Sequence, residues 1–350
     1  MASRDYLPPW ALRSGVVHTV FTAFGQKYFP SGHWQPEQEY IFEGFEGVPL
    51  YGEGRRNLGD RGTMIATYGI TGDLTNQWFL DQLATRADAA GFSVIRFDWR
   101  GHGRSAELSP TLTADGLREG QDFLAIAKRA IALGYPRPFW CVGYSLGGQL
   151  ALWGAWAGQN DPEGVIGGAA VICPNLDSNR SLTHLVQTPW GRRIEQSISR
   201  QLRRLALQLH GYHPQKFDLG AIARATTIAG FDRELVIPRL GFATVADYYY
   251  ASSPLRFLSQ LTLPTYILYA ADDPLFDPTI IAILQAVAQE NTQIKLCLTR
   301  HGGHVGYFSS RHCQRIWKDG DRHWGSHRLV DWLVAQSCSG QSCSGEAADG

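Results

Sequence analysis

The 350-residue sequence contains no long apolar run and no excess of charge of either sign. No stretch approaches the about 18 consecutive apolar residues of a membrane-spanning helix, so the sequence predicts none. Its 32 basic and 32 acidic residues balance, which argues against a nucleic-acid partner for the chain as a whole. The first residues carry no apolar core after their charges, so we expect no secretory signal and a cytoplasmic location.

Cysteine is also scarce, with six residues scattered along the chain. Without an export signal, we expect these thiols to stay reduced rather than to form disulfides. Cys141 and Cys173 fall within apparent strands, where they are expected to pack as small apolar side chains rather than to act as nucleophiles. Hydrophobic residues make up 44% of the chain and charged residues 18%, which is typical of a globular protein.

Short apolar runs alternate with helical patterns through most of the chain. The apolar runs are near-continuous, as in strands that are buried on both faces of a parallel sheet. This alternation predicts an α/β fold, with a doubly wound, mostly parallel sheet and right-handed crossovers. The expected strands are residues 63–68, 93–97, 139–143, 169–173, 265–269 and 294–299, and the expected helices are residues 76–90, 115–133, 146–157, 278–289 and about 322–336.

The alternation stops between about residues 175 and 250, where no strand is evident. Thr188-Pro189 is suited to cap and start a helix that ends near Gly211, and the apolar residues of this helix recur at intervals of three and four. We expect the segment to form a helical cap over the carboxyl ends of the strands. The expected division is a core of residues 1–174 and 251–336 with an N-terminal extension over 1–40, a helical cap inserted over 175–250, and a disordered tail over 337–350.

The other faces of this cap helix carry five arginines and a single acid, Glu195. Such a basic stripe can hold a protein near anionic lipid head groups. A solvated face that serves solubility alone also explains it, and we favour that interpretation, with peripheral membrane contact as the alternative. The arginines are Arg192, Arg193, Arg200, Arg203 and Arg204.

The most informative motif is Gly143-Tyr144-Ser145-Leu146-Gly147, which lies between an expected strand and an expected helix. Gly-x-Ser-x-Gly in this setting is typical of a nucleophile elbow, in which a sharp turn projects the serine hydroxyl into a cleft. The two glycines allow the strand and the helix to approach each other closely. Ser145 is therefore the predicted nucleophile.

Two later strand ends supply the partners that a serine nucleophile needs. One leads into Asp272-Asp273, and the next leads into His301-Gly302-Gly303-His304. A serine hydroxyl is a weak nucleophile until a base takes its proton, and a carboxylate holds that base in the right tautomer. Solvated turns with surface side chains are the alternative interpretation of both segments. In the order serine, acid, histidine, the predicted catalytic residues are Ser145, Asp273 and His304.

An oxyanion that forms during acyl transfer needs two fixed N–H donors. We predict the backbone N–H of Leu146, directly after the nucleophile, and that of Ile70 in the loop Gly69-Ile70-Thr71-Gly72. The glycines of that loop also suit a tight strand-to-helix turn. No third ligand at recognisable spacing accompanies the two histidines, so we expect no metal and no cofactor.

A further glycine-rich loop, Asp98-Trp99-Arg100-Gly101-His102-Gly103-Arg104, follows the second expected strand. A histidine here precedes the serine and so breaks the order serine, acid, histidine. We therefore expect Arg100, His102 and Arg104 to be structural.

Taken together, these motifs resemble the YheT-like (embryogenesis-associated) family of α/β-hydrolases. The resemblance covers nearly the whole chain and is most specific at Pro8-Pro9-Trp10 and in two later segments, Ala271-Asp272-Asp273-Pro274 and His301-Gly302-Gly303-His304-Val305-Gly306-Tyr307. It implies the α/β-hydrolase fold and a serine hydrolase of carboxylic esters, often lipid-like acyl esters, and it carries the triad onto Ser145, Asp273 and His304. Some relatives transfer acyl groups. The chain departs from the family at Tyr68-Gly69, where His-Gly is common, and residues 176–240 match poorly.

The predicted function is therefore hydrolysis of medium-chain or lipid-like acyl esters, with a small-molecule ester as the expected partner. An acyltransferase would use the same residues, and the triad does not by itself distinguish an ester from an amide. A non-catalytic binding module is the alternative from another class, because a fold does not fix a function. The complete set of serine, acid and histidine argues against that module. No feature predicts an oligomeric state.

Overall fold

The computed structural model describes residues 6–25 and 34–341 of the chain. Its centre is an eight-stranded sheet with the order β1-β2-β4-β3-β5-β6-β7-β8. β1 pairs antiparallel with β2 and β2 with β4, while every other neighbouring pair is parallel. The strands are β1 (Gln38–Glu43), β2 (Pro49–Arg55), β3 (Thr63–Thr67), β4 (Ser93–Phe97), β5 (Phe139–Tyr144), β6 (Ile166–Ile172), β7 (Thr265–Ala270) and β8 (Ile294–Thr299).

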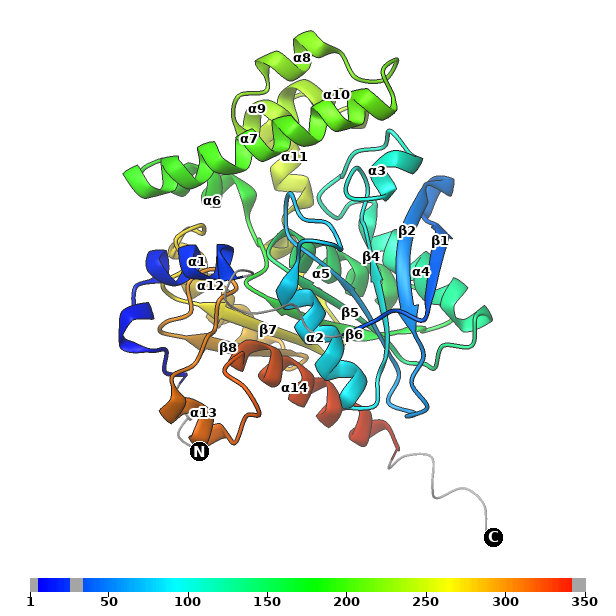
Figure 1. Cartoon of the computed structure of the whole chain (residues 1–350), viewed down its shortest axis with the longest axis vertical. Coiled ribbons are helices and arrows are strands. Elements are labelled where there is room, and N and C mark those ends of the chain that lie inside the picture. Colours follow the sequence, from blue (N-terminus) through cyan, green and yellow to red (C-terminus); the bar gives the residue numbers. More distant parts are fainter. Residues whose placement is uncertain (1–5, 26–33, 342–350) are drawn as a thin grey trace.

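Helices cover both faces of the sheet, which confirms the doubly wound α/β prediction (Figure 1). α2 (Trp78–Ala89) and α14 (Trp324–Gln341) lie on one face, and α4 (Glu119–Ala132) and α5 (Leu146–Gln159) pack together on the other. No helix among the described residues is both long enough and apolar enough to cross a bilayer. The remaining core helices are α1 (Gly15–Ala23), α3 (Ser105–Leu108), α12 (Thr279–Glu290), α13 (Arg311–Trp317) and the short turns η1 (Trp10–Leu12), η3 (Phe45–Gly47), η5 (Pro254–Arg256) and η6 (Leu258–Gln260).

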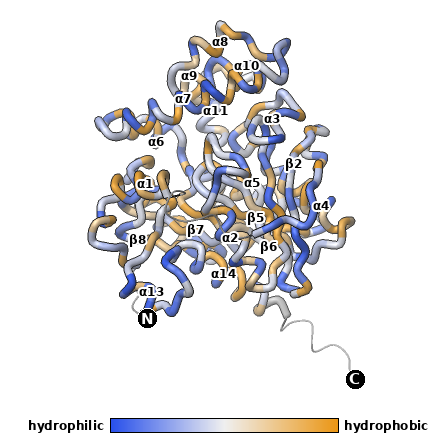
Figure 2. The backbone as a smooth tube through the Cα atoms, viewed as in Figure 1, coloured by the Kyte–Doolittle hydropathy of each residue, from blue (hydrophilic) through white to orange (hydrophobic). Residues whose placement is uncertain are grey.

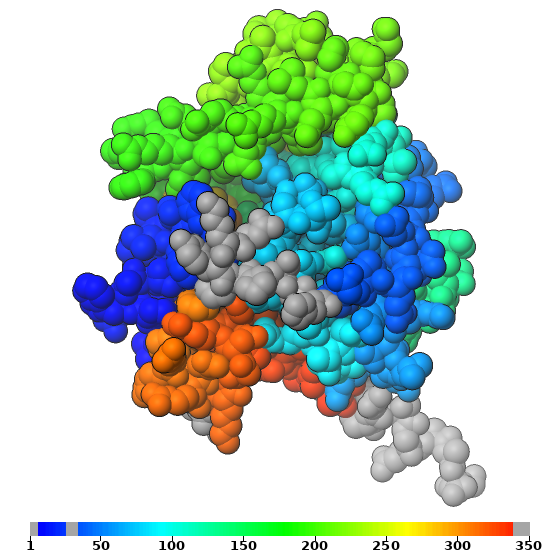
Figure 3. Space-filling view, in the orientation of Figure 1, coloured from blue at the N-terminus to red at the C-terminus, as the bar shows by residue number. Residues whose placement is uncertain are grey.

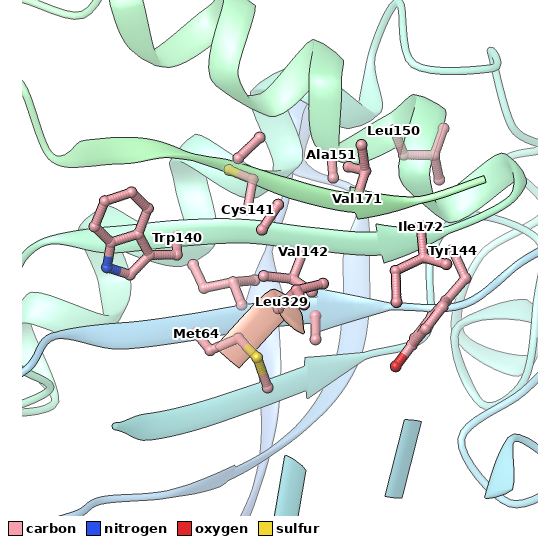
Figure 4. Close-up of a cluster of buried hydrophobic side chains, with 14 of the residues drawn as sticks. Met64, Trp140, Cys141, Val142, Tyr144, Leu150, Ala151, Val171, Ile172 and Leu329 are labelled. Carbon is pink, nitrogen blue, oxygen red and sulfur yellow. The ribbon is translucent and has the colours of Figure 1, made fainter. Parts of the chain in front are cut away.

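The apolar core lies along the central strands, where hydrophobic residues are concentrated (Figure 2). All six residues of β5 are buried, as expected for a strand with a neighbour on each side and helices over both faces. Figure 4 shows Val142 of β5 close to Val171 and Ile172 of β6, with Leu150 of α5 above them. The five cysteines within the described residues are all free.

Between β6 and β7 the chain forms helices, and all of these except the short turns η5 and η6 make up the cap (Figures 1 and 3). The side chain of Thr188 accepts the N–H of Gly191, with Pro189 in the first helical position, as the sequence predicted. The cap has an apolar cluster of its own, which includes Leu202, Leu209 and Phe231. Its helices are α6 (Ser178–Leu185), α7 (Pro189–Tyr212), α8 (Leu219–Arg224), α9 (Ile228–Phe231), the π-helix η4 (Asp232–Val236), α10 (Ile237–Leu240) and α11 (Val245–Ser252).

Two parts of the structure differ from expectation. β1 and β2 were not predicted, because β2 contains two glycines among charged residues and β1 is largely exposed. The tail expected to be disordered over 337–350 begins as helix, since α14 continues to Gln341. Ser337 Oγ donates to Arg61 O at 3.0 Å, which fastens this last turn to the core. The rest of that tail lies outside the described residues.

Candidate active site

Ser145 lies at the sharp turn between β5 and α5. Its backbone adopts φ 53° and ψ −122°, a conformation that is strained for a residue other than glycine. A Cβ atom at Gly143 would lie 2.1 Å from Gly147 O, and one at Gly147 would lie 2.3 Å from Tyr68 O. Both positions therefore require glycine, because the backbone segments approach too closely for any side chain.

Ser145, His304 and Asp273 form a continuous series of hydrogen-bond contacts. His304 Nε2 lies 2.8 Å from Ser145 Oγ, and His304 Nδ1 lies 2.8 Å from Asp273 Oδ2. A carboxylate only accepts hydrogen bonds, so the Nδ1 proton faces Asp273 and Nε2 is left to accept from the serine hydroxyl. The other carboxylate oxygen, Asp273 Oδ1, accepts the N–H of Leu275 at 2.9 Å. The structure brings the three predicted residues together with a geometry suited to proton transfer from serine to histidine.

The neighbouring carboxylate, Asp272, points away from the imidazole of His304. Its Oδ1 accepts the N–H of Gly303 at 2.9 Å, and its Oδ2 lies 3.5 Å from His301 Nδ1. Burial raises the pKa of Asp272. Asp272 therefore supports the loop that carries His304 rather than the reactive side chain itself.

The N-terminal helix α1 holds the same loop from the other side. Thr19 Oγ1 accepts the backbone N–H of His304 at 2.8 Å and donates to Gly15 O at 2.7 Å. Phe308 N–H donates to His18 Nε2 at 3.1 Å, and burial lowers the pKa of His18 to about 4, which keeps this imidazole neutral. The sequence predicted no role for Thr19, because this residue lies outside the predicted catalytic motifs.

The loop after β3 passes directly beside the serine. A Cβ atom at Gly69 would lie 3.1 Å from Ser145 Cβ and 3.5 Å from its Oγ. The backbone N–H groups of Ile70 and Leu146 have no acceptor within the described part of the chain, and both residues border the same pocket as Ser145. Both predicted oxyanion donors are thus placed beside the serine with free N–H groups.

Tyr68, where the sequence departs from the usual His-Gly pair, anchors this loop through a buried carboxylate. The Tyr68 hydroxyl donates to Asp98 Oδ1 at 2.5 Å, and the same oxygen accepts the N–H of Leu74 at 3.1 Å. Asp98 Oδ2 accepts the N–H of Arg104 at 2.9 Å. Burial raises the pKa of Asp98 to about 6. The Asp98 carboxylate therefore joins Tyr68, directly before the loop, to Leu74, two residues after it.

The three basic residues that follow Asp98 have structural contacts. Arg100 forms a buried ion pair with Asp122 at 2.7 Å, and Arg104 pairs with Glu39 at 2.8 Å on the surface. His102 stacks on Trp99, with ring centroids 3.6 Å apart. His102 also lines the pocket beside Ser145, a position that the sequence gave no reason to expect.

That pocket lies between the core and the cap and has a cavity volume of about 100 Å³. Ser145 is part of its wall, and most of the other lining side chains are apolar. The apolar lining includes Leu112, Leu275 and Phe276 from the core and Leu182, Leu185, Ile198 and Leu202 from the cap.

A thiol also lies near the reactive residues. The Sγ atom of Cys173 and ligand atoms of Asp273 and His304 lie within 4.8 Å of one another. Burial raises the pKa of Cys173, so the thiol keeps its proton, whereas metal ligation needs the thiolate. Both imidazole nitrogens of His304 are already engaged by Asp273 and Ser145. The donor set suits acid–base chemistry better than metal binding.

Residues 72–316 match the sequence model described as "Alpha/beta hydrolase family". The protein named "Putative esterase slr0264" from Synechocystis sp. is 49% identical over 352 residues, which cover 95% of each chain. "Putative esterase YheT" from Escherichia coli is 26% identical over 79% of this chain and 78% of its own length. The solved structure of the Pyrococcus furiosus esterase Pf2001 superposes with a TM-score of 0.55 over 88% of this chain and 97% of that one, at 14% identity, and so supports the fold alone.

Proposed function

This chain belongs to the alpha/beta hydrolase family, and on that premise we propose that it is a serine esterase with Ser145 as nucleophile. The observation that carries the proposal is the pair of 2.8 Å contacts that His304 makes with Ser145 Oγ and Asp273 Oδ2, beside a pocket. Similarity to two proteins that are named esterases supports an ester as the substrate.

In the proposed reaction, Ser145 Oγ attacks the acyl carbonyl carbon while His304 Nε2 accepts the hydroxyl proton. The N–H groups of Leu146 and Ile70 donate to the oxyanion. His304 then returns the proton to the departing alcohol, and an acyl-enzyme remains. Water attacks that ester with His304 as base, and the carboxylic acid leaves. Asp273 holds the imidazole in position and stabilises its charged form.

The apolar lining of the pocket supports a medium-chain or lipid-like acyl group. Each methylene that moves from water into an apolar site contributes about 0.8 kcal/mol, or roughly a fourfold change in binding. We expect kcat/KM for p-nitrophenyl esters to rise from acetate to octanoate. A maximum at acetate would contradict this substrate class without contradicting the nucleophile.

The nucleophile is tested by a fluorophosphonate probe and by Ser145→Ala. We expect the probe to label Ser145 and the variant to lose both labelling and ester hydrolysis. Ser259→Ala, at an exposed serine in η6, is the matched control and should keep both. Ester hydrolysis that persists in Ser145→Ala would overturn the proposal. Adding glycerol as a competing acceptor shows whether the acyl group goes to water, as proposed, or to an alcohol.

The arginine face of α7 is exposed in the structure, and its single acid is turned inward. Glu195 Oε1 accepts from Ser199 Oγ at 2.8 Å and from Ile228 N–H at 2.9 Å. We propose that the arginines form a solvated face that keeps the cap soluble. Co-sedimentation with vesicles should then not depend on the content of anionic lipid, and an increase with phosphatidylglycerol would favour membrane contact instead.

A further inference from the structure

The pocket beside Ser145 contains side-chain atoms that have no hydrogen-bond partner within the described residues. They are the indole Nε1 of Trp99, which can only donate, and His102 Nε2, Asn175 Oδ1 and Ser181 Oγ. His102 and Ser181 are each 3% exposed. Buried polar atoms without a partner are uncommon, and each requires an explanation. Their position on the wall of the pocket that contains Ser145 indicates that a ligand supplies the missing partner.

Two of these free atoms can only accept hydrogen bonds. His102 Nδ1 lies 3.3 Å from Arg100 O, a carbonyl that must accept, so the ring proton is on Nδ1. Burial lowers the pKa of His102 to about 3, so the ring is neutral and Nε2 carries a lone pair. Asn175 uses its Nδ2 to donate to Gln149 Oε1 at 2.8 Å and to Ser178 Oγ at 2.7 Å. Its Oδ1 is left as an acceptor.

Two carboxyl groups line the same pocket, one from the core and one from the cap. Asp115 precedes α4 and Asp232 begins η4, and each is 7% exposed. Tyr249 donates to Asp232. Neither carboxyl forms an ion pair within the described chain, and no lysine or arginine is among the described residues that line the pocket. The pocket therefore offers acceptor atoms and two carboxyl groups without a compensating cation.

Hydrogen bonds connect the acceptor groups to the segment that carries Ser145. Gln149 follows Ser145 by about one turn of α5, which corresponds to a rise of about 6 Å. Gln149 Nε2 donates to Asp115 O at 2.7 Å, and Asn175 N–H donates to Ser145 O at 3.1 Å. A substrate group only a few bonds from an ester carbonyl at Ser145 can reach this region.

We propose that these acceptors bind a hydrogen-bond donor of the substrate, either a hydroxyl or an ammonium group. The acceptor cluster consists of His102 Nε2, Asn175 Oδ1 and the carboxyl groups of Asp115 and Asp232. The inference rests on the proposed esterase function and narrows its substrate class. The preferred substrates are acyl esters that carry a hydroxyl or ammonium group, and no carboxylate or phosphate, in the part that occupies the pocket.

The two carboxyl groups have raised pKa values, which a bound hydrogen-bond donor or cation would lower. Burial and the nearby Asp232 carboxylate raise the pKa of Asp115, and burial raises the pKa of Asp232 to about 7. A bound cation or donor favours the ionised forms of such carboxyls. A ligand carboxylate would instead place a third acidic group in the same buried region.

The kinetic test compares esters that differ in a single group. The acyl-side series is the p-nitrophenyl esters of hexanoic, 6-hydroxyhexanoic and 6-aminohexanoic acids and of adipic acid, and the alcohol-side pair is propyl and glyceryl hexanoate. We expect the hydroxyl or ammonium member of at least one set to exceed its methyl analogue about tenfold in kcat/KM. The adipate ester should fall below the hexanoate ester. Values within twofold throughout both sets would overturn the inference.

Variants locate the preference in the acceptor cluster. In Asp115→Asn and Asp232→Asn the advantage of the donor-bearing ester over its methyl analogue should shrink at least about threefold, while hydrolysis of p-nitrophenyl hexanoate continues. Asparagine suits the backbone of Asp115, which has φ 48°. Asp60→Asn, at an exposed position between β2 and β3, is the matched control and should leave the ratio unchanged. An unchanged ratio in both pocket variants would overturn the assignment.

A binding measurement separates this inference from the proposed function. Calorimetry on Ser145→Ala with hexylamine hydrochloride, 1-hexanol and sodium hexanoate needs no turnover. We expect hexylammonium or hexanol to bind at least about tenfold more tightly than hexanoate. If p-nitrophenyl hexanoate is not hydrolysed by the wild type, the esterase proposal fails while this binding order still tests the acceptor cluster. Equal or tighter binding of hexanoate would overturn the inference alone.

Discussion

The candidate catalytic residues, here called the reactive end, and the acceptor cluster differ in how completely their polar groups are partnered. At the reactive end, both oxygens of Asp273 and both nitrogens of His304 make contacts within the protein. At the acceptor cluster, His102 Nε2 and Asn175 Oδ1 make none with the described residues. The reactive end is thus fully partnered within the protein, whereas the acceptor cluster has free acceptor atoms. On our proposals, reactivity comes from the core, and selectivity is shared between the core and the cap.

The largest expected effect is on kcat, and it distinguishes the two adjacent aspartates, Asp272 and Asp273. Asp273→Asn should lower kcat about 10⁴-fold, because an amide favours the wrong imidazole tautomer. Asp272→Asn should lower it less than about tenfold, because Asp272 only supports the loop through Gly303 and His301. Steady-state kinetics on p-nitrophenyl hexanoate, with circular dichroism to verify folding, measures both. Equal losses in the two variants would mean that the reactive end is not organised around Asp273.

A smaller effect is expected where the oxyanion loop is anchored. Tyr68→Phe removes the hydroxyl that donates to the buried Asp98 and leaves that carboxylate with one donor fewer. We expect kcat to fall about tenfold with KM nearly unchanged, because a displaced Ile70 N–H weakens oxyanion binding and not substrate binding. Tyr212→Phe, at a half-exposed tyrosine of the cap, is the control and should retain full kcat. A rise in KM at constant kcat would assign Tyr68 to substrate binding instead.

The smallest effect concerns stability at the acceptor cluster. Because the pKa of Asp232 is raised to about 7, this carboxyl binds its proton more tightly in the folded than in the unfolded chain. Its contribution to the free energy of unfolding therefore falls as the pH rises from about 4 to about 7. Asp232→Asn has no such proton, so the free energy of unfolding of the variant, relative to wild type, should increase between about pH 5 and pH 8.

Urea denaturation at the two pH values measures that difference. Other titratable groups near Asp232 are Asp115, Glu119 of α4, and Tyr248 and Tyr249 of α11. The pKa of Asp115 is also raised, by burial and by the nearby Asp232 carboxylate, so the profile of Asp115→Asn is needed alongside. A relative stability that stays constant, or that decreases with pH, would show that the Asp232 carboxyl is not held in a buried, uncompensated state.

The parts of this structure that sequence reasoning could predict are those with a local signal. Six strands are continuous apolar runs, and Ser145, Asp273 and His304 follow a fixed order at strand ends. β1 and β2 lack that signal, because β1 is an exposed edge strand that need not be apolar and β2 has two glycines among charged residues. Asp115 and Asp232 lie far apart in the sequence, and Asp232 belongs to a cap without a recognisable motif. Only the folded chain shows that they share one pocket.

The hydrogen bond from His304 N–H to Thr19 Oγ1 joins residues 285 positions apart in the sequence. Contacts of such separation form late in folding, because the entropy of closing the intervening chain must be overcome first. During synthesis, α1 leaves the ribosome long before the loop that it will hold. The reactive end is therefore assembled only after the loop that carries His304 has been made, 285 residues after Thr19. On the proposed assignment, a nascent chain that has not reached this loop lacks the base that activates Ser145.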